Sequence, residues 1–170
     1  MRQRADSIVR RLAVAISTAF MLLKAALPAA APLPLPATFA TTIGNGLLCL
    51  DALDITFYFH YLSVAFGPPY KHAEGAYWFH TRKAKLWKVP ISDLLVSDGR
   101  SNLLFLAAVA QAAPVKLEQA IAAETGIHYR ASDAGKYARL TSNTGSNIVY
   151  FQNIAKIYCG KSEYLLPRTR

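Results

Sequence analysis

The sequence lacks the short motifs that identify common enzymes and metal-binding proteins. Its 170 residues contain no glycine-rich phosphate-binding loop, no Gly-x-Ser-x-Gly motif and no Cys-x-x-Cys or His-x-x-x-His pair. The histidines, His60, His72, His80 and His128, are spread along the chain without the spacing of metal ligands. We therefore predict no metal, no cofactor and no enzymatic activity. The alternative is a small hydrolase with a histidine and carboxylate site.

Acidic residues are also scarce, with 10 Asp and Glu against 19 Lys and Arg and a net charge of +9. Residues 1–40 hold five of the basic residues and one of the acidic ones, which leaves 14 basic and 9 acidic residues and a net charge of +5 for the rest. This moderate excess gives no reason to predict nucleic-acid binding. It favours an acidic protein partner or an anionic envelope surface.

No apolar run reaches the roughly 20 residues that a membrane-spanning helix needs. The first 11 residues instead carry four arginines, residues 12–23 are uncharged and largely apolar, and residues 29–40 are rich in Ala, Pro and Thr. This order is typical of an export signal. We predict a signal segment at 1–40, cleaved after Ala30 or Ala40, and a periplasmic or secreted protein. An uncleaved membrane anchor is the alternative.

Only two cysteines are present, Cys49 and Cys159. In an oxidising compartment, an even pair at opposite ends of a domain predicts a disulfide. Closing a loop of about 110 residues would stabilise the fold by about 4 to 5 kcal/mol in the chain-entropy model. The competing interpretation makes one of the two cysteines a nucleophile paired with a histidine.

Apolar periodicity and turn residues predict two helices. Asp51 or Asp54 begins the first, which runs to about Ala65, and Pro114 begins the second, which ends at Thr125. Gly44 to Gly46 are interpreted as a flexible segment before the first helix. The predicted strands, with a hairpin between the first two, are 76–81, 85–89, 103–109, 137–141 and 148–158, the last folded back at 152–153.

This order predicts an α+β fold in which two helices pack on one face of an antiparallel sheet. We expect one domain at 41–162 and a flexible tail at 163–170. Similar stretches after the two helices suggest a duplicated helix-plus-hairpin module, with repeats at 50–111 and 114–160. Gly67 to Lys71 resembles Gly126 to Arg130, and Ala84 to Trp87 resembles Ala155 to Tyr158.

A helix that ends at Gly67-Pro68-Pro69, followed by a strand with Tyr77 and Trp78, resembles the module of the SmpA/OmlA outer-membrane assembly lipoproteins. Two such modules in tandem resemble the secreted β-lactamase inhibitor proteins. The chain departs from the first family, which carries an acylated cysteine near its start. The resemblance implies a protein-binding sheet and transfers no functional residue.

Tyr77, Trp78, Arg82, Lys85 and Trp87 form the candidate binding site. They combine aromatic and basic side chains, which are frequent anchors of protein interfaces. We expect a partner protein of the envelope and predict an adaptor, an inhibitor or an immunity-type factor. The identity of the partner and the oligomeric state stay open. Binding to anionic lipid or polysaccharide is a further alternative, and it requires a cluster of basic residues on one face: Lys85, Lys88, Arg139 and Lys156.

Overall fold

The computed structural model describes residues 34–132, 139–151 and 154–162. The predicted export signal and tail therefore lie outside the described residues, apart from residues 34–40. The helices of the described part are α2 (Phe39–Leu47), α3 (Ile55–Phe66) and α4 (Pro114–Thr125). Its strands are β1 (Lys71–Ala73), β2 (Ala76–His80), β3 (Lys85–Leu86), β4 (Val89–Ser97), β5 (Leu103–Ala110), β6 (Tyr129–Ala131), β7 (Leu140–Ser142), β8 (Asn147–Phe151) and β9 (Ile154–Ser162).

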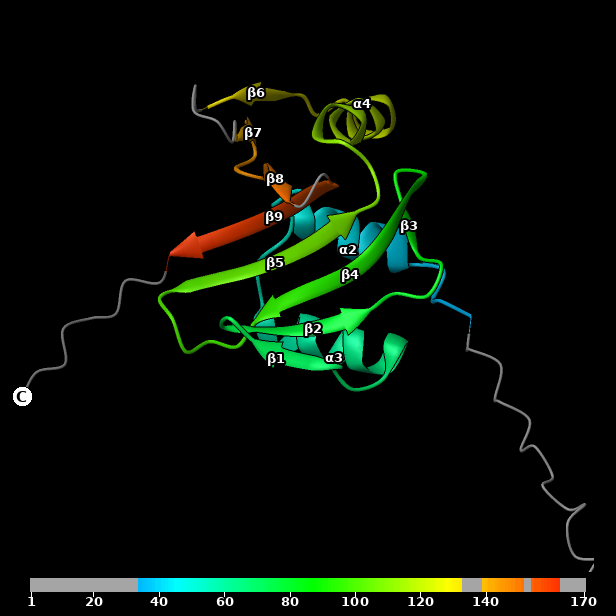
Figure 1. The fold of residues 1–170 in the computed structure, drawn as a ribbon, viewed down its shortest axis with the longest axis vertical. Coiled ribbons are helices and arrows are strands. Elements are labelled where there is room, and N and C mark those ends of the chain that lie inside the picture. Colours follow the sequence, from blue (N-terminus) through cyan, green and yellow to red (C-terminus); the bar gives the residue numbers. More distant parts are fainter. Residues whose placement is uncertain (1–33, 133–138, 152–153, 163–170) are drawn as a thin grey trace, which may run out of the picture. The chain divides into compact units, whose positions relative to one another are not determined.

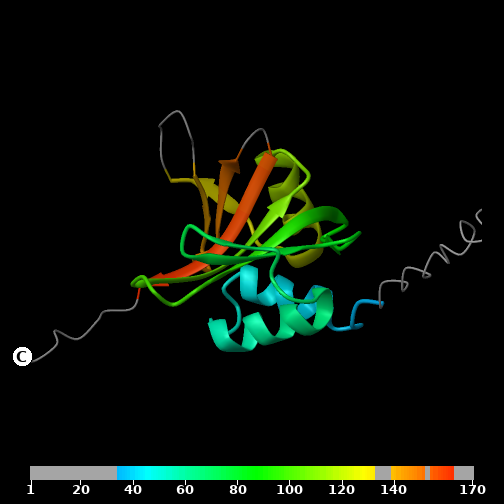
Figure 2. The ribbon, with the colours of Figure 1, turned by 60° about the horizontal axis from the view of Figure 1, so that its bottom comes forward.

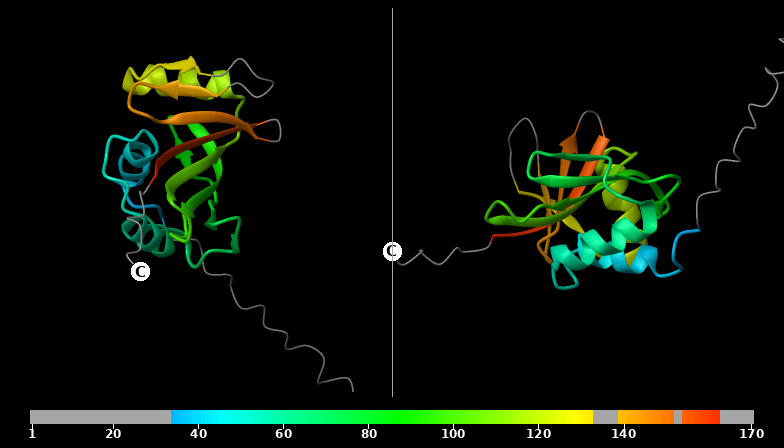
Figure 3. Two further views of the ribbon diagram at one scale, coloured as in Figure 1. Left: turned by 90° about the vertical axis from the view of Figure 1, so that its left-hand side faces the viewer. Right: turned by 90° about the horizontal axis from the view of Figure 1, so that it is seen from below.

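The strands of the described residues form one antiparallel sheet in the order β1-β2-β4-β5-β9-β8-β7-β6, and β3 pairs with β4 (Figure 1). Twist accumulates along the sheet, so β6, β7 and β8 are rotated relative to β2 and β4 (Figure 3). Both ends of this order are strands of three residues. Short edge strands limit unwanted pairing with other chains. The predicted α+β fold with an antiparallel sheet is confirmed.

The helices lie on one face of the sheet. α2 packs against β5 and β9, α3 against β2, β4 and β5, and α4 against β8 and β9. Figure 2 shows α2 and α3 together on one side. The main core gathers between this face and the helices, and its fully buried members include Leu47, Leu62, Leu117 and Ile121. Because side chains alternate along a strand, the opposite face receives every second residue, and we call it the helix-free face.

Two of the helices begin and end as the sequence predicts. The Asp54 carboxylate accepts a hydrogen bond of 3.0 Å from the Phe57 N–H at the start of α3. Pro114 occupies the first turn of α4, and Gly126 ends that helix with a left-handed φ of 72°. Both arrangements satisfy or remove backbone groups that a helix end leaves unpaired.

The helix α2 is not predicted from the sequence, in which Gly44 to Gly46 indicate a flexible segment. α2 contains Gly44 and Gly46, and both are buried. A Cβ on Gly46 would lie 2.6 Å from Cζ of Tyr58 and 2.8 Å from Cδ2 of Leu106. The interpretation of these glycines as flexible is wrong, because here glycine permits close packing of α2 on its neighbours.

The pairing partner of β2 is the second difference between the sequence-based prediction and the structure. The predicted hairpin between 76–81 and 85–89 is wrong, because β2 pairs with β4 from His80 opposite Asp93 to Ala76 opposite Ser97. β3 instead turns directly into β4 at Trp87 and Lys88, whose φ values are 50° and 63°. A left-handed residue other than glycine costs about 1 to 2 kcal/mol. Burial of the Trp87 ring, which is 8% exposed in the main core, offsets this cost.

Each half of the sheet consists of a helix followed by strands laid down in the same order. α3 precedes β1, β2, β4 and β5, and α4 precedes β6, β7, β8 and β9. β5 and β9 pair at the centre, so the two sets run outward in mirrored order. Gly67 and Gly126 each end the helix of their set. The second sequence similarity, however, relates β3 to β9, which occupy different places in the two sets. A shared origin of the halves stays a prediction.

Lys83 offers a test of backbone strain in the loop between β2 and β3. Its φ is 64°, and its side chain is exposed. Glycine relieves the left-handed strain there, whereas Lys85→Gly only weakens a strand, at a cost of about 0.5 to 1 kcal/mol. We expect Lys83→Gly to be about 1 kcal/mol more stable than Lys85→Gly. Urea denaturation of both variants measures the difference, and equal midpoints would show that the loop is unstrained.

Candidate functional site

The residues of the predicted binding site do not form one surface. Trp87 is 8% exposed and packs in the main core beside Gly44 of α2. Tyr77 and Trp78 are neighbours on β2 and therefore point to opposite faces of the sheet. Arg82 and Lys85 are exposed, in and after the loop that follows β2. The structure separates the two tryptophans, and any role of these residues in binding stays a prediction.

Tyr77 belongs to the helix side of the sheet. Its ring lies 4.8 Å from the ring of Phe59 on α3, and it stacks on the imidazole of His72 at 4.3 Å. Nε2 of His72 lies 2.9 Å from Oδ2 of Asp98. The His72 hydrogen bond, followed by the Arg100 backbone N–H, lowers the pKa of the Asp98 carboxyl. Tyr77 is thus part of a packed cluster that orders the β1–β2 end of the sheet.

Trp78 lies on the helix-free face between two lysines. Nζ of Lys71 is 4.5 Å from the centre of the indole ring, and Nζ of Lys156 is 5.6 Å from it. The indole N–H donates a 3.4 Å hydrogen bond to the Ala73 carbonyl. Burial lowers the pKa of Lys156, and the charge of Glu74 opposes this shift. The two ammonium groups hold the indole in place by cation–π attraction.

An apolar hollow lies beside Trp78 on the same face. It has a volume of about 190 Å³, and its walls come from β5, β8 and β9. The lining residues are Leu103, Phe105, Ala107, Val149, Lys156 and Tyr158. Leu103 is 45% exposed, whereas Ala107 is fully buried. The hollow therefore runs from an exposed rim to the apolar cluster under Trp78.

A tyrosine, a carboxylate and a histidine meet where β2 and β4 pair on this face. The Tyr70 hydroxyl donates a 3.0 Å hydrogen bond to Oδ1 of Asp93, and Nδ1 of His80 lies 3.3 Å from the same oxygen. Burial and then the Asp93 hydrogen bond raise the pKa of Tyr70. Asp93 is thus shared by two partners. The arrangement fixes the orientation of His80, whose side chain is 62% exposed.

The alternative enzyme hypothesis requires a histidine in hydrogen-bond contact with a carboxylate inside a cleft. His72 has such a contact with Asp98 but does not line the apolar hollow. His128 lines a separate pocket together with Gly126 and Arg130, but its Nδ1 lies 3.6 Å from Oε1 of Glu118, beyond hydrogen-bond length. His128 therefore lacks the hydrogen bond, and His72 is not among the lining residues of either cavity. Within the described residues, no three His, Cys, Asp or Glu side chains converge as metal ligands.

The lipid or polysaccharide alternative requires basic residues on a common face. Lys156 belongs to the helix-free face, because it stands over the Trp78 ring. Lys88 forms a 3.2 Å ion pair with Glu124 of α4 and therefore lies on the helix side. The structure thus places these two lysines on opposite sides of the sheet.

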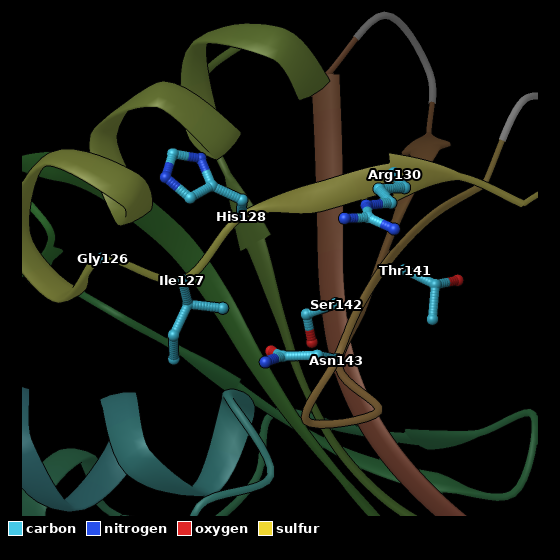
Figure 4. Close-up of a pocket in the computed structure, with 7 residues that line it drawn as sticks. All are labelled: Gly126, Ile127, His128, Arg130, Thr141, Ser142 and Asn143. Carbon is cyan, nitrogen blue, oxygen red and sulfur yellow. The ribbon is translucent and has the colours of Figure 1, made fainter.

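A second and larger pocket lies between the end of α4, β6 and the turn that joins β7 to β8 (Figure 4). Its volume is about 480 Å³. The residues that line it are Gly126, Ile127, His128, Arg130, Thr141, Ser142 and Asn143. Ile127 supplies an apolar wall, and most of the other side chains carry polar groups. No signal in the sequence marks this pocket, because its residues come from both strands of the β6–β7 pair and the turns at its base.

A buried hydrogen-bond network fixes the floor of the larger pocket. Tyr129 Oη donates to Ser146 Oγ at 2.9 Å, and Ser146 Oγ donates to the Leu47 carbonyl at 2.7 Å. The Ser146 N–H donates to Oγ of Ser142, a lining residue, at 3.1 Å. The network joins the turn before β8 to β6 and to the end of α2. The pocket is therefore built on a rigid base.

The hydroxyl of Tyr129 makes alkaline stability a test of this network. Burial is the main cause that raises its pKa from 10.0 to about 12. The unfolded state therefore ionises first, and the contribution of Tyr129 to stability, fully present below pH 10, is lost as the pH rises toward 12. We expect Tyr129→Phe to be about 1 kcal/mol less stable than the parent at pH 7.

This deficit should shrink as the pH rises above 10, because phenylalanine cannot ionise. Urea denaturation at neutral and alkaline pH measures it. A deficit that does not change with pH would contradict the assigned pKa. Tyr150→Phe serves as the control, because Tyr150 is 45% exposed.

Most of the residues that gather around Trp78 on the helix-free face were not identified from the sequence. Lys71, Lys156 and Tyr158 come from strands far apart in the chain, and only their pairing in the sheet brings them near Trp78. One local signal was present. Phe105, Ala107 and Val109 alternate with the residues of the main core, as expected for a strand with two apolar faces.

The predicted disulfide is present and links Cys49, after α2, to Cys159 on β9, with a Cα–Cα distance of 5.3 Å. No helix within 34–132, 139–151 and 154–162 is long and apolar enough to cross a membrane. Comparison with models of protein families, with curated proteins and with solved structures finds no match for this chain. The resemblance to the SmpA/OmlA module and to the β-lactamase inhibitor proteins therefore stays a prediction.

Proposed function

We propose that this chain is an exported protein that binds another envelope protein noncovalently through the helix-free face of its sheet. One observation carries the proposal. An apolar hollow with an exposed rim at Leu103 lies on the face opposite the helices of the described residues, beside Trp78, which is 7% exposed under the ammonium groups of Lys71 and Lys156. Aromatic side chains ringed by polar ones are typical of the centres of protein interfaces.

The dimensions of the hollow favour a protein partner over a small molecule. Its volume of about 190 Å³ is smaller than the roughly 300 Å³ of typical small-ligand pockets. It is large enough for one apolar side chain of a partner. Glu74, whose Oε1 lies 3.9 Å from Nζ of Lys71, offsets part of the positive charge of Lys71 and Lys156, and a carboxylate beside the inserted side chain would meet the remainder. We propose an acidic partner that inserts an aromatic or aliphatic residue.

Export is supported by the order of charged and apolar residues at the amino terminus and by the disulfide, since disulfides persist in oxidising compartments. Phe39 is 3% exposed, and its ring lies 5.6 Å from the ring of Phe66. Cleavage after Ala40 would remove this contact from the core. We therefore expect cleavage after Ala30, which the intact mass of the exported protein measures. A mature chain that begins after Ala40 would contradict this expectation.

Site-specific photo-crosslinking tests the binding face. A photoreactive residue at Leu103, on the rim of the hollow, should crosslink one defined acidic protein in the envelope. The same residue at Val115 is the control, because Val115 is 62% exposed on α4, on the helix side. Equal crosslinking of the same protein at both positions would contradict the proposed face.

Binding of the purified partner then tests the charges. Lys71→Glu should raise the dissociation constant at least about tenfold, since a repulsive charge replaces an attractive one. Lys116→Glu makes the same change on α4 and should leave affinity within about twofold of the parent. Affinity should also fall as salt is added. An unchanged dissociation constant for Lys71→Glu would show that the partner binds elsewhere.

A further inference from the structure

We infer that the larger pocket, between α4, β6 and the β7–β8 turn, binds a small molecule that carries a carboxylate or a phosphate group. Arg130 would be the main contact of that group. The site is separate from the helix-free hollow, which is lined by other residues. The inference therefore does not depend on the proposed protein partner.

The hydrogen-bonding groups still open in the pocket are mainly donors. Arg130 is exposed, and its guanidinium takes part in no ion pair or hydrogen bond with another described residue. Asn143 is likewise exposed, and its amide has no partner within the described part of the chain. Figure 4 shows both side chains among those that border the pocket. A guanidinium presents a planar set of N–H donors that matches a carboxylate or a phosphate.

The hydroxyl groups of the pocket are already engaged. Thr141 Oγ1 lies 3.0 Å from Oγ of Ser132 and 2.9 Å from Oδ1 of Asn147. Ser142 Oγ accepts from the Ser146 N–H and lies 2.8 Å from Oγ1 of Thr144. These contacts hold the wall in place before any ligand arrives. A preorganised site loses less entropy on binding.

The charge balance of the lining also favours an anion. None of the lining residues in the described part is acidic, and Arg130 carries a full positive charge. The Glu118 carboxylate on α4 lies 3.6 Å from Nδ1 of His128 and is 21% exposed. The volume of about 480 Å³ falls within the range of small-ligand pockets. Ile127 provides an apolar wall for the body of the ligand.

Glucose, gluconate and glucose 6-phosphate test the inference, because all three are six-carbon polyhydroxy compounds and only gluconate and glucose 6-phosphate carry an anionic group. We expect saturable binding of gluconate or glucose 6-phosphate, measured by calorimetry at ligand concentrations up to about 20 mM, and none of glucose. Backbone amide signals of Ile127 and Asn143 should shift in NMR spectra of the same titration. Inorganic phosphate shows whether the anion alone suffices.

Arg130→Gln should raise the dissociation constant at least about tenfold, whereas Arg82→Gln, an exposed arginine outside the pocket, should leave it within about twofold. Arg130→Lys should retain phosphate binding better than carboxylate binding, because lysine keeps the charge and loses the planar set of donors. Equal weakening by Arg130→Gln and Arg82→Gln would reveal nonspecific ion pairing. That result, glucose binding as strong as gluconate binding, or no saturable binding at all would overturn the inference.

Discussion

Gly46→Ala is expected to lower the free energy of unfolding by about 2 kcal/mol. The added methyl group would lie 2.6 Å from Cζ of Tyr58 and 2.8 Å from Cδ2 of Leu106, and both side chains are buried. Overpacking of this kind costs about 3 kcal/mol at the upper end of its usual range. The better helix propensity of alanine returns about 1 kcal/mol. Urea denaturation with linear extrapolation measures the result.

Gly44→Ala is the matched control in the same helix. Its Cβ would lie 3.7 Å from the Trp87 ring, an ordinary packing distance. Since only helix propensity changes there, we expect this variant to gain up to about 1 kcal/mol. Tyr58→Phe should reduce the cost of Gly46→Ala, because it removes the hydroxyl that the new methyl group meets first. A Gly46→Ala variant as stable as Gly44→Ala would show that α2 shifts freely.

The double variant Cys49→Ala and Cys159→Ala is expected to lose about 4 to 5 kcal/mol of stability. The bridge closes a loop between residues separated by 110 positions and so restricts the unfolded chain. For a domain of this size, the loss corresponds to a fall in Tm on the order of 15 °C. Differential scanning calorimetry measures it.

Reduction of the parent protein should reproduce most of the effect, because it opens the same loop while leaving both sulfur atoms in place, including that of the fully buried Cys159. The same reductant should leave the double variant unchanged, which separates loss of the bridge from side effects of the reductant. A parent protein that keeps its Tm after complete reduction would rule out the loop-closure explanation. It would also remove the main structural support for an oxidising compartment.

The elements that the sequence predicts well carry their signals locally. Asp54, Pro114 and Gly126 mark helix ends through hydrogen bonds and backbone angles within a few residues. The strand predicted at 103–109, which the structure shows as β5 (Leu103–Ala110), is evident from its apolar length. Tertiary contacts decide the other cases. Gly46 indicates flexibility in isolation and close packing only once Tyr58 lies above it.

In the candidate sites too, the sequence indicates the residue types, and tertiary contacts decide where those residues lie. Composition identifies Trp78 and Trp87 as similar aromatic residues beside basic ones. Strand pairing buries both rings, that of Trp87 in the main core and that of Trp78 in the smaller apolar cluster on the helix-free face. The larger pocket shows the same dependence. Arg130 and Asn143 are distant in the sequence, and they border the same pocket because β6 pairs with β7. The spacing of residues in the sequence does not reveal that pairing.

The sequence by itself determined the α+β class, the ends of two helices, the cysteine pair and an amino terminus typical of export, because each depends on residue type and short spacing. The tertiary structure alone decided that Trp78 lies between Lys71 and Lys156, that α2 packs through its glycines, and that a pocket forms beside Arg130. The physical reason is that burial and strand register are set by contacts between residues far apart in the chain.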